Sequence, residues 1–224
     1  MAKSKDNISI AVVRRLPRYY RYLGELLSSG TAKISSEELS RRMGLTASQI
    51  RQDLNCFGGF GQQGYGYNVE LLYNELGEIL GLRKEHKVAL IGAGHLGHAL
   101  ANWMLGRKVG FNLVGAFDVK DHIVGTKIRD DVQVRHIDEL EAFCEKVHPD
   151  VAILTLPRRE AVNMAKKLKE LGVKGFWNFS NMDLNIIGLG VPVENVHLSD
   201  SLMMLGYRLH EQAEAERKAL ENAD

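Results

Sequence analysis

The chain has 224 residues, which is enough for one large domain or for two modest ones. Its apolar fraction of 45% and charged fraction of 25% are those of an ordinary globular protein, and no apolar run approaches the ~20 residues that cross a bilayer. Cys56 and Cys144 are the only cysteines, which excludes a disulfide framework and a thiolate zinc site. The first residues contain no secretion signal. We therefore expect a cytoplasmic protein with no membrane association.

The charge is unevenly distributed along the chain. Residues 1–60 contain ten Lys and Arg against five Asp and Glu, a balance of +5. The remaining residues contain nineteen and twenty-three, a balance of −4, and the two sum to the net charge of +1. A basic N-terminal region ahead of a mildly acidic body indicates that the N-terminal region meets a polyanion.

The first predicted element after a frayed arm is a helix over residues 13–29, with apolar residues at helical spacing. Pro17 fits only near the first turn of this helix. A basic stripe within it either contacts phosphates or forms a solvated face, and it consists of Arg14, Arg15, Arg18 and Arg21.

Residues 35–57 predict two short helices with a tight connection. Ser35 can cap the first helix, and Gly44 follows its last residue. Thr46 can cap the second helix, over residues 47–57. This is the pattern of a helix-turn-helix unit, whose second helix enters the major groove of DNA, although a plain helical hairpin has the same pattern. The polar residues that we expect to face DNA from this unit are Thr46, Ser48, Gln49, Arg51, Gln52 and Asn55.

Five glycines interleave with aromatic residues over residues 58–67. A β-wing following a recognition helix would have this composition, because a narrow glycine tip can approach DNA closely. The alternative is a plain interdomain loop. An amphipathic helix over residues 69–82 closes the predicted first domain (1–82), and the charged residues 83–87 form the linker.

The stretch KVALIGAGHLGHAL, residues 87–100, is typical of a nucleotide-binding βα unit. A short apolar strand leads into Gly92, Gly94 and Gly97 at G-x-G-x-x-G spacing. The helix that follows offers unpaired N–H groups to a pyrophosphate. Asp118 ends a second strand 21 residues after Gly97, where an acid accepts hydrogen bonds from the ribose of NAD and repels the 2′-phosphate of NADP. The alternative is an ordinary βα turn with a surface aspartate. We expect this helix to end near residue 106, with its apolar side formed by Leu96, Ala99, Leu100 and Trp103.

The rest of the second domain (83–198) alternates strands and helices, which predicts a doubly wound α/β fold with a parallel sheet. We expect further strands at 113–118, 133–137, 150–154, 175–179 and 195–198, and helices at 138–146 and about 158–171. Thr155, Pro157 and Asn178 lie at the ends of predicted strands, where such folds bind ligands. Residues 199–224 predict a long final helix whose apolar face must pack on its own domain or on a second subunit.

The chain carries little that predicts catalysis. It has no G-x-S-x-G, H-E-x-x-H or C-x-x-C motif, and His95 and His98 fit ordinary helix positions better than a metal site or a catalytic base. The second domain is just long enough for the nucleotide fold and leaves no substrate domain. The nucleotide is therefore more plausibly a signal than a reagent. The alternatives are a small NAD-dependent oxidoreductase and a repressor that binds coenzyme A or another adenine nucleotide.

The chain resembles the Rex family of redox-sensing transcriptional repressors over nearly its whole length. The stretches that carry the resemblance are SSEELSRRMGLTASQIRQDLNCFGGFGQQGYGYNVELL, VALIGAGHLGHAL, AFD, ILTLPR and GFWNFS. The resemblance implies a non-enzymatic homodimer with an N-terminal winged helix, a Rossmann domain and a domain-swapped final helix (199–224). It also implies that NADH releases the repressor from operators of respiratory and fermentative genes, whereas NAD⁺ permits DNA binding. A dimer would place two recognition helices about one DNA turn (~34 Å) apart, so we expect a palindromic operator.

The resemblance also implies roles for individual residues. Arg51 and Gln52 would face the major groove, and the wing would enter the minor groove with Gln62, Gln63, Gly64 and Tyr65. NADH and NAD⁺ would be held by Gly92, Ala93, Gly94, His95, Leu96, Gly97 and Asp118, with Trp103 at a position where the family often has tyrosine. Arg21 matches a family arginine that links the DNA-binding domain to the nucleotide switch.

Two positions depart from the family pattern. Gln52 replaces the lysine that usually lies between Arg51 and Asp53, which removes a charge and is expected to alter affinity or operator preference. The resemblance implies an ion pair between Arg21 and the switch aspartate of the family. His197 stands at the position of that aspartate, with Asp200 one turn later, so the acidic partner expected for Arg21 is absent from that position. We hypothesise that His197 makes the switch pH-sensitive. An NADH titration without pH dependence would contradict this.

Overall fold

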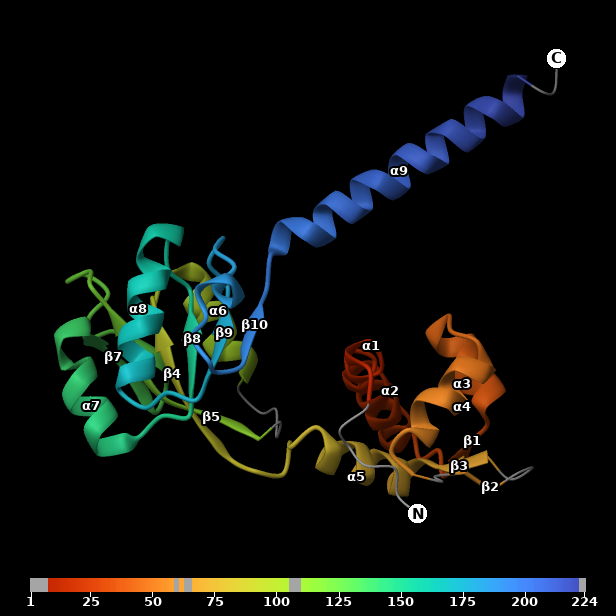
Figure 1. Cartoon of the computed structure of the whole chain (residues 1–224), viewed down its shortest axis with the longest axis horizontal. Helices are drawn as coiled ribbons and strands as arrows, with labels where there is room; N and C mark the ends of the chain where they lie inside the picture. Colours follow the sequence, from red (N-terminus) through yellow and green to blue (C-terminus); the bar gives the residue numbers. More distant parts are fainter. Residues whose placement is uncertain (1–7, 59–60, 63–65, 105–109, 222–224) are drawn as a thin grey trace. The chain divides into compact units, whose positions relative to one another are not determined.

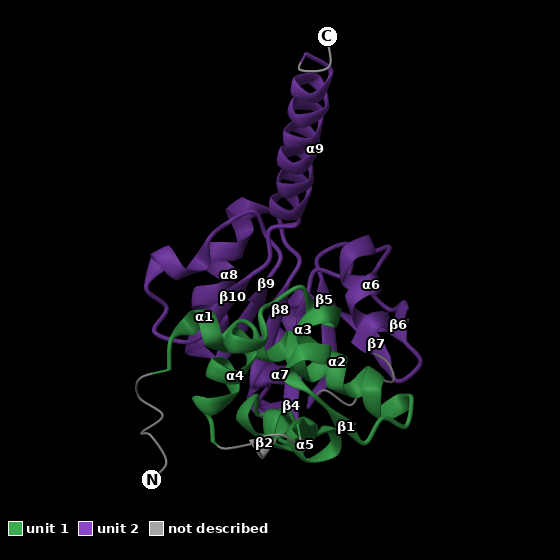
Figure 2. Cartoon of the chain, turned by 90° about the vertical axis from the view of Figure 1, so that its right-hand side faces the viewer, with its two compact units in different colours: residues 1–84 green, residues 85–224 purple. Residues whose placement is uncertain are grey.

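The computed structural model describes residues 8–58, 61–62, 66–104 and 110–221. The chain divides into two compact units, residues 1–84 and residues 85–224 (Figure 2). Among the described residues, no helix is both long and apolar enough to cross a membrane.

The described residues of the first unit form five helices and a small sheet. Its elements are α1 (Ile10–Val13), α2 (Leu16–Ser28), β1 (Lys33–Ile34), α3 (Ser36–Met43), α4 (Ala47–Asn55), β2 (Gly61–Gln62), β3 (Gly66–Asn68) and α5 (Val69–Ile79) (Figure 1). Apolar side chains from the helices form one buried core, in which Leu23, Leu39, Ile50, Leu54 and Leu76 are fully buried.

The predicted helix, turn and helix of residues 35–57 are present as α3 and α4. The Ser35 hydroxyl accepts a hydrogen bond from the Glu38 N–H (3.1 Å), and the Thr46 hydroxyl accepts one from the Gln49 N–H (3.1 Å). Gly44 ends α3 in the left-handed conformation (φ 64°), which a residue without a Cβ adopts at little cost. Both caps and the turn therefore form where the sequence predicts them.

Several boundaries in this unit differ from the predictions. The single helix predicted over residues 13–29 is two helices that meet at Arg14 and Arg15. Pro17 explains the break, because its nitrogen cannot donate to the Val13 carbonyl and its ring would clash with that carbonyl. Helix α4 ends at Asn55, two residues earlier than expected, and α5 ends at Ile79, three residues earlier than expected.

The small sheet has the strand order β1-β3-β2 and is antiparallel. The sequence analysis missed β1, a strand of two residues in which Ile34 pairs with Tyr67. Gly66 is required in β3, because its φ is +71° and a Cβ there would lie 2.6 Å from the Ile34 carbonyl oxygen. The tip of the predicted wing, residues 63–65, lies outside the described residues.

The second unit contains a seven-stranded sheet with the order β10-β9-β8-β4-β5-β7-β6. Its strands are β4 (His86–Ile91), β5 (Phe111–Asp118), β6 (Lys127–Arg129), β7 (Val132–His136), β8 (Val151–Leu154), β9 (Gly175–Asn178) and β10 (Val193–Asn195). Its helices are α6 (His95–Met104), η2 (Ile137–Glu139), α7 (Leu140–Val147), α8 (Arg158–Glu170), η3 (Leu184–Ile187) and α9 (Leu198–Glu221). All pairings are parallel except that of the edge strand β6 with β7. The doubly wound parallel sheet is therefore confirmed, and its strand order reverses between β4 and β8.

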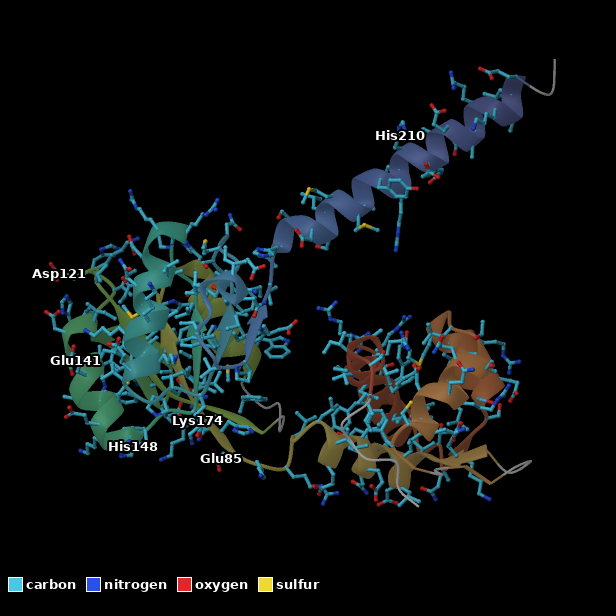
Figure 3. All side chains as sticks on the ribbon, in the orientation of Figure 1. Glu85, Asp121, Glu141, His148, Lys174 and His210 are labelled. Atoms are coloured by element: carbon cyan, nitrogen blue, oxygen red, sulfur yellow. The ribbon has the colours of Figure 1, made fainter. Side chains whose placement is uncertain are left out.

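Helices cover the two faces of this sheet. Helices α7 and α8 pack on one face through residues such as Phe143 and Leu168, and the ion pair between Glu141 and Lys167 (2.7 Å) joins the two helices (Figure 3). Helix α6 packs on the opposite face through Ala101 and Met104.

Four details of this unit differ from the predictions. Strand β4 begins at His86, inside the predicted linker, and the last strand is Val193–Asn195 instead of 195–198. The edge strand β6 was not predicted. Helix α6 buries Gly97, Ala101 and Met104, whereas Trp103 on its predicted apolar side is 46% exposed. Gly97 and Ala101 are small and allow the first turns of the helix to approach the sheet closely.

Helix α9 extends away from the sheet of its unit as one long helix (Figure 1). Side chains project from it on all sides, with His210 near its middle (Figure 3). Its apolar residues are at least half exposed: Leu198, Leu202, Met203, Met204, Leu205, Tyr207, Leu209 and Leu220. Such a surface on a single helix is typical of an interaction site.

Candidate nucleotide-binding and DNA-binding sites

The glycine loop lies at the carboxyl end of β4, at the point where the strand order of the sheet reverses. Gly92 has a φ of +96°, and a Cβ at this position would lie 2.7 Å from the carbonyl oxygen of Thr155. The Thr155 hydroxyl donates a hydrogen bond to the Gly92 carbonyl (2.5 Å). Thr155 directly follows β8, and its hydrogen bond brings this predicted pocket residue into direct contact with the glycine loop.

The other two glycines meet different surroundings. A Cβ on Gly97 would collide with the Gly92 carbonyl oxygen, so this glycine lets α6 pack against the turn. A Cβ on Gly94 would have nothing within 4 Å. Gly94 and His95 are exposed, and α6 begins at His95, so its first N–H groups have no partner within the helix. The loop can therefore accept an anion at the helix N-terminus.

Asp118 is 8% exposed at the end of β5 and braces the glycine loop. One carboxylate oxygen accepts a hydrogen bond from the Ala93 N–H (2.7 Å), and the other accepts one from the Lys120 N–H (3.0 Å). An ionised carboxylate has about four acceptor positions, so two remain for ribose hydroxyls.

A cavity of about 410 Å³ lies between the glycine loop, the end of β5 and α8. Gly92 and Asp118 line it, as the sequence analysis expects of a nucleotide site. Leu156, directly after β8, and Ile137, directly after β7, also line it. A further wall is formed by α8 residues that were not predicted as ligand contacts: Arg159, Glu160, Asn163, Met164 and Lys167. Their position after β8, at the reversal of strand order, is the signal that could have found them.

Four predicted nucleotide residues lie outside the cavity beside the glycine loop. Trp103 lies beyond the first turns of α6, with its ring centroid 5.9 Å from that of Trp177. Asn178 is fully buried, and its amide nitrogen donates to Met182 O (2.6 Å) and Asn195 Oδ1 (2.8 Å). Pro157 is exposed at the N-terminus of α8. Leu96 is half-buried in the first turn of α6.

A second, apolar cavity of about 470 Å³ lies on the α6 side of the sheet. Both tryptophans of the chain line it, together with side chains of β4, β8, β9 and β10 such as Val88, Ile153 and Val193. Nothing in the described part of the chain gathers three or more His, Cys, Asp or Glu residues into a metal site.

Helix α4 presents Ser48, Arg51, Gln52 and Asn55 to solvent, as predicted for a recognition helix. The Arg51 guanidinium donates to the Ser36 hydroxyl (2.7 Å) and to a Glu37 carboxylate oxygen (3.0 Å) at the N-terminus of α3. Arg51 is therefore oriented by the first helix of the helix-turn-helix unit.

Gln49 was expected to project outward but is half-buried. Its amide nitrogen donates to the carboxylate of Asp53, one turn later on α4 (2.8 Å). Asp53 was not predicted as a functional residue, and its side chain is 1% exposed. It also accepts two hydrogen bonds from the Arg15 guanidinium (2.6 and 2.8 Å) and one from the Tyr19 hydroxyl (2.7 Å).

The ionisation of this cluster follows from its partners. Burial alone raises the pKa of the Asp53 carboxyl, but hydrogen bonds from Arg15, Tyr19 and Gln49 outweigh burial and hold that pKa below its usual value. Burial, followed by the hydrogen bond to Asp53, raises the pKa of the Tyr19 hydroxyl. Asp53 is therefore an ionised carboxylate with a compensating positive charge beside it.

The other predicted basic residues differ in their availability. Arg14 is exposed, the Arg18 guanidinium donates to the Met43 carbonyl, and the Arg21 guanidinium lies 5.8 Å from the Tyr22 ring centroid. Gln62 is the last residue of β2, whereas Gln63, Gly64 and Tyr65 lie outside the described residues.

Of the remaining switch residues, His197 is half-buried immediately before α9, and Asp200 is exposed in the first turn of that helix. The Asp200 N–H donates to the His197 carbonyl (3.1 Å). Arg21 belongs to the first unit, and both other residues belong to the second.

Comparisons with known proteins cover both units. The family model "Putative DNA-binding protein N-terminus" matches residues 7–55, and the model "CoA binding domain" matches residues 83–182. The redox-sensing transcriptional repressor Rex of Caldanaerobacter subterraneus subsp. tengcongensis is 55% identical over 93% of this chain and 92% of its own length. That of Clostridium novyi is 52% identical over 93% of this chain and 98% of its own length.

Solved structures agree with these relatives. RSP in complex with beta-NAD⁺ and operator DNA is 52% identical, covers 95% of this chain and 97% of its own, and matches with a TM-score of 0.84. RSP in complex with beta-NADH is 49% identical, covers 96% and 99%, and has the same TM-score. RSP is described as a Rex-family repressor. This chain belongs to the Rex family of redox-sensing transcriptional repressors.

Proposed function

We propose that this protein is a dimeric, non-enzymatic repressor whose affinity for palindromic operator DNA reports the ratio of NADH to NAD⁺. The observation that carries the proposal is the occurrence, on one chain, of a capped helix-turn-helix unit and a glycine loop at the reversal point of a doubly wound sheet. A relative that is 52% identical was solved with NAD⁺ and operator DNA together. A protein that binds chromosomal DNA would act in the cytoplasm.

The nucleotide is assigned to the glycine loop. Its pyrophosphate would lie against the open side of Gly94, where no side chain intervenes, and at the N-terminus of α6. The ribose would donate to the acceptor positions that remain on Asp118, which favours NAD(H) over NADP(H). The cavity beside α8 would hold the adenosine half.

The DNA is assigned to α4 and the wing. Arg51 is pre-oriented by Ser36 and Glu37, and the exposed side chain of Gln52 follows it. Arginine is suited to bidentate recognition of guanine in the major groove, whereas a glutamine at position 52 can hydrogen-bond adenine. We assign Arg14, Arg18 and the tip of the wing, residues 62–65, to the DNA backbone and the minor groove.

The switch requires NADH and NAD⁺ to prefer different arrangements of the dimer, because a ligand with equal affinity for both states shifts nothing. The two nucleotides differ in the charge and planarity of the nicotinamide ring. A change of about tenfold to hundredfold in operator affinity corresponds to a coupling of roughly 1.4–3 kcal/mol. We assign this coupling to Arg21, His197 and Asp200 by their positions in the family pattern.

The dimer is assigned to α9, residues 199–224 of the proposed domain division. Leu202, Leu205 and Leu209 are exposed at helical spacing. The apolar cavity on the α6 side of the sheet supplies a complementary surface, which includes Trp103 and Trp177. We propose that α9 of one protomer is exchanged with its partner and covers apolar surface there, because a helix with these side chains is unfavourable in water.

The test is a gel shift on the operator duplex that was crystallised with RSP, with NADH, NAD⁺, NADPH and coenzyme A in parallel. The coenzyme A lane is included because the family model over residues 83–182 is described as a CoA binding domain. Release by NADH alone supports the proposal. Release by coenzyme A would transfer the sensing role to that ligand, and substrate-dependent hydride turnover would favour an oxidoreductase.

A further inference from the structure

Asp53 is the centre of a buried ionic cluster in the first unit, formed with Arg15, Tyr19 and Gln49. Asp53 lies on the proposed recognition helix, yet its side chain is only 1% exposed and cannot reach DNA without unfolding. Its carboxylate accepts four hydrogen bonds, from Arg15 (two), Tyr19 and Gln49.

We propose that Asp53 is a positioning residue for operator recognition, which fixes the rotation of α4 and the orientation of Gln49 through its pairing with Arg15. This inference rests on the DNA-binding function proposed above. It assigns to Arg15 a role inside the protein, in place of contact with a phosphate.

The geometry indicates that the ion pair with Arg15, and not apolar packing alone, fixes the rotation of α4. The other inward residues of α4, Ile50 and Leu54, are apolar, and apolar contacts tolerate small rotations of a helix. The Arg15 pair is bidentate, with both nitrogen–oxygen distances below 3 Å, and such pairs allow one relative orientation. A buried carboxylate is strongly unfavourable without its partners, so α4 is held in the rotation that keeps the three hydrogen bonds from outside the helix, two from Arg15 and one from Tyr19.

The position of Arg15 extends this fixation to the N-terminal helices. Arg15 lies at the break between α1 and α2, and it is the N-cap residue of α2. Tyr19 is one turn later on α2. Asp53 therefore ties the recognition helix to the start of α2, 38 positions earlier in the chain.

Asp53 also determines which end of the Gln49 amide is available. The amide nitrogen of Gln49 donates to Asp53, so the amide oxygen is the atom that is available to accept a hydrogen bond from DNA. An amide oxygen accepts from the N4 amino group of cytosine or the N6 amino group of adenine. Loss of Asp53 would free the amide to turn, and Gln49 would then lose its preference for one pattern of base edges.

The experiment compares binding to the RSP operator duplex with binding to a scrambled duplex of the same composition. Both affinities are measured by fluorescence anisotropy over a series of salt concentrations. The variants are Asp53→Asn, Arg15→Gln and the double variant, with Arg14→Gln as the matched arginine that lacks the contact with Asp53. Thermal unfolding by circular dichroism reports whether each variant is folded.

We expect Asp53→Asn and Arg15→Gln to lower the ratio of operator affinity to scrambled affinity by about tenfold, the effect of one poorly read base pair. Binding to the scrambled duplex and its salt dependence should stay unchanged. The double variant should be no worse than the worse single variant, because both remove one interaction. Arg14→Gln should instead weaken both duplexes equally and reduce the salt slope by about one.

An unchanged affinity ratio in a folded Asp53→Asn variant would overturn the inference, as would an Arg15→Gln variant that behaves like Arg14→Gln. If Asp53→Asn does not fold, the comparison of Arg15→Gln with Arg14→Gln decides the question. Failure of the wild-type protein to distinguish the two duplexes would instead contradict the proposed function itself.

Discussion

Substitution of Gly94 by alanine separates nucleotide binding from folding. A Cβ at this position meets no atom of the protein within 4 Å, and the backbone φ of Gly94 is not in the left-handed region. The free protein should therefore fold with unchanged stability. In the proposed complex, however, the added methyl group would occupy the space through which the pyrophosphate approaches the backbone.

The size of the effect follows from the cost of an extra methyl group in a filled space, about 1–3 kcal/mol. Since 1.4 kcal/mol corresponds to a factor of ten, NADH affinity should fall by about 5- to 150-fold. Operator binding in the absence of NADH should remain, and the concentration of NADH that releases DNA should rise by the same factor.

The assay uses energy transfer from tryptophan to bound NADH. Both tryptophans of the chain, Trp103 and Trp177, lie in the second unit, so this signal reports on the nucleotide-binding unit directly. Gly97→Ala is the contrasting variant, because its Cβ would collide with the Gly92 carbonyl and should lower both NADH affinity and the melting temperature. Unchanged NADH affinity in Gly94→Ala would refute the placement of the pyrophosphate.

Three further outcomes are expected. Leu205→Glu should convert the proposed dimer into a folded monomer with weak operator affinity, because it places a charge on the exposed apolar face of α9. A dimer that persists in sedimentation would exclude this face as the dimer interface. Thr46→Ala should lower the free energy of unfolding by about 1 kcal/mol through loss of the cap on α4, measured by urea denaturation. Because the pKa of Asp53 is lowered in the folded protein, its ion pair with Arg15 should stabilise fully above the ordinary value of 3.8, and this stabilisation should vanish as the pH falls through the lowered pKa. The difference in unfolding free energy between wild type and Asp53→Asn should therefore shrink in acid, and a difference that grows there would contradict the assignment.

The features that the sequence analysis predicted correctly depend on residues close together in the chain. The caps Ser35 and Thr46 and the contact of Gly97 with Gly92 act within a few residues, so the spacing along the chain is sufficient to predict them. The doubly wound sheet followed from the regular alternation of apolar strands and helices. The helix break before Pro17 was missed although a local rule predicts it, because proline is tolerated in the first turn of a helix but not in its interior.

The features that were missed depend on contacts between distant residues. Periodicity assigned the polar Gln49 to the outside of α4 and gave Asp53 no role, because buried polar and charged side chains are rare without partners. The partner, Arg15, is 38 positions away, and nothing in the local pattern pairs the two. Trp103 was assigned to the buried side of α6 for the converse reason: apolar residues are expected inside, whereas this one lines a surface cavity.

The central claim is that operator occupancy reports a ratio of two nucleotides. The most direct measurement follows occupancy of a labelled operator duplex by anisotropy while the NADH fraction is varied at constant total NADH plus NAD⁺. The account predicts that occupancy falls as the NADH fraction rises, at each of several total concentrations, and that the Gly94→Ala variant is released only at correspondingly higher NADH concentrations. Occupancy that does not change with the NADH fraction would contradict it.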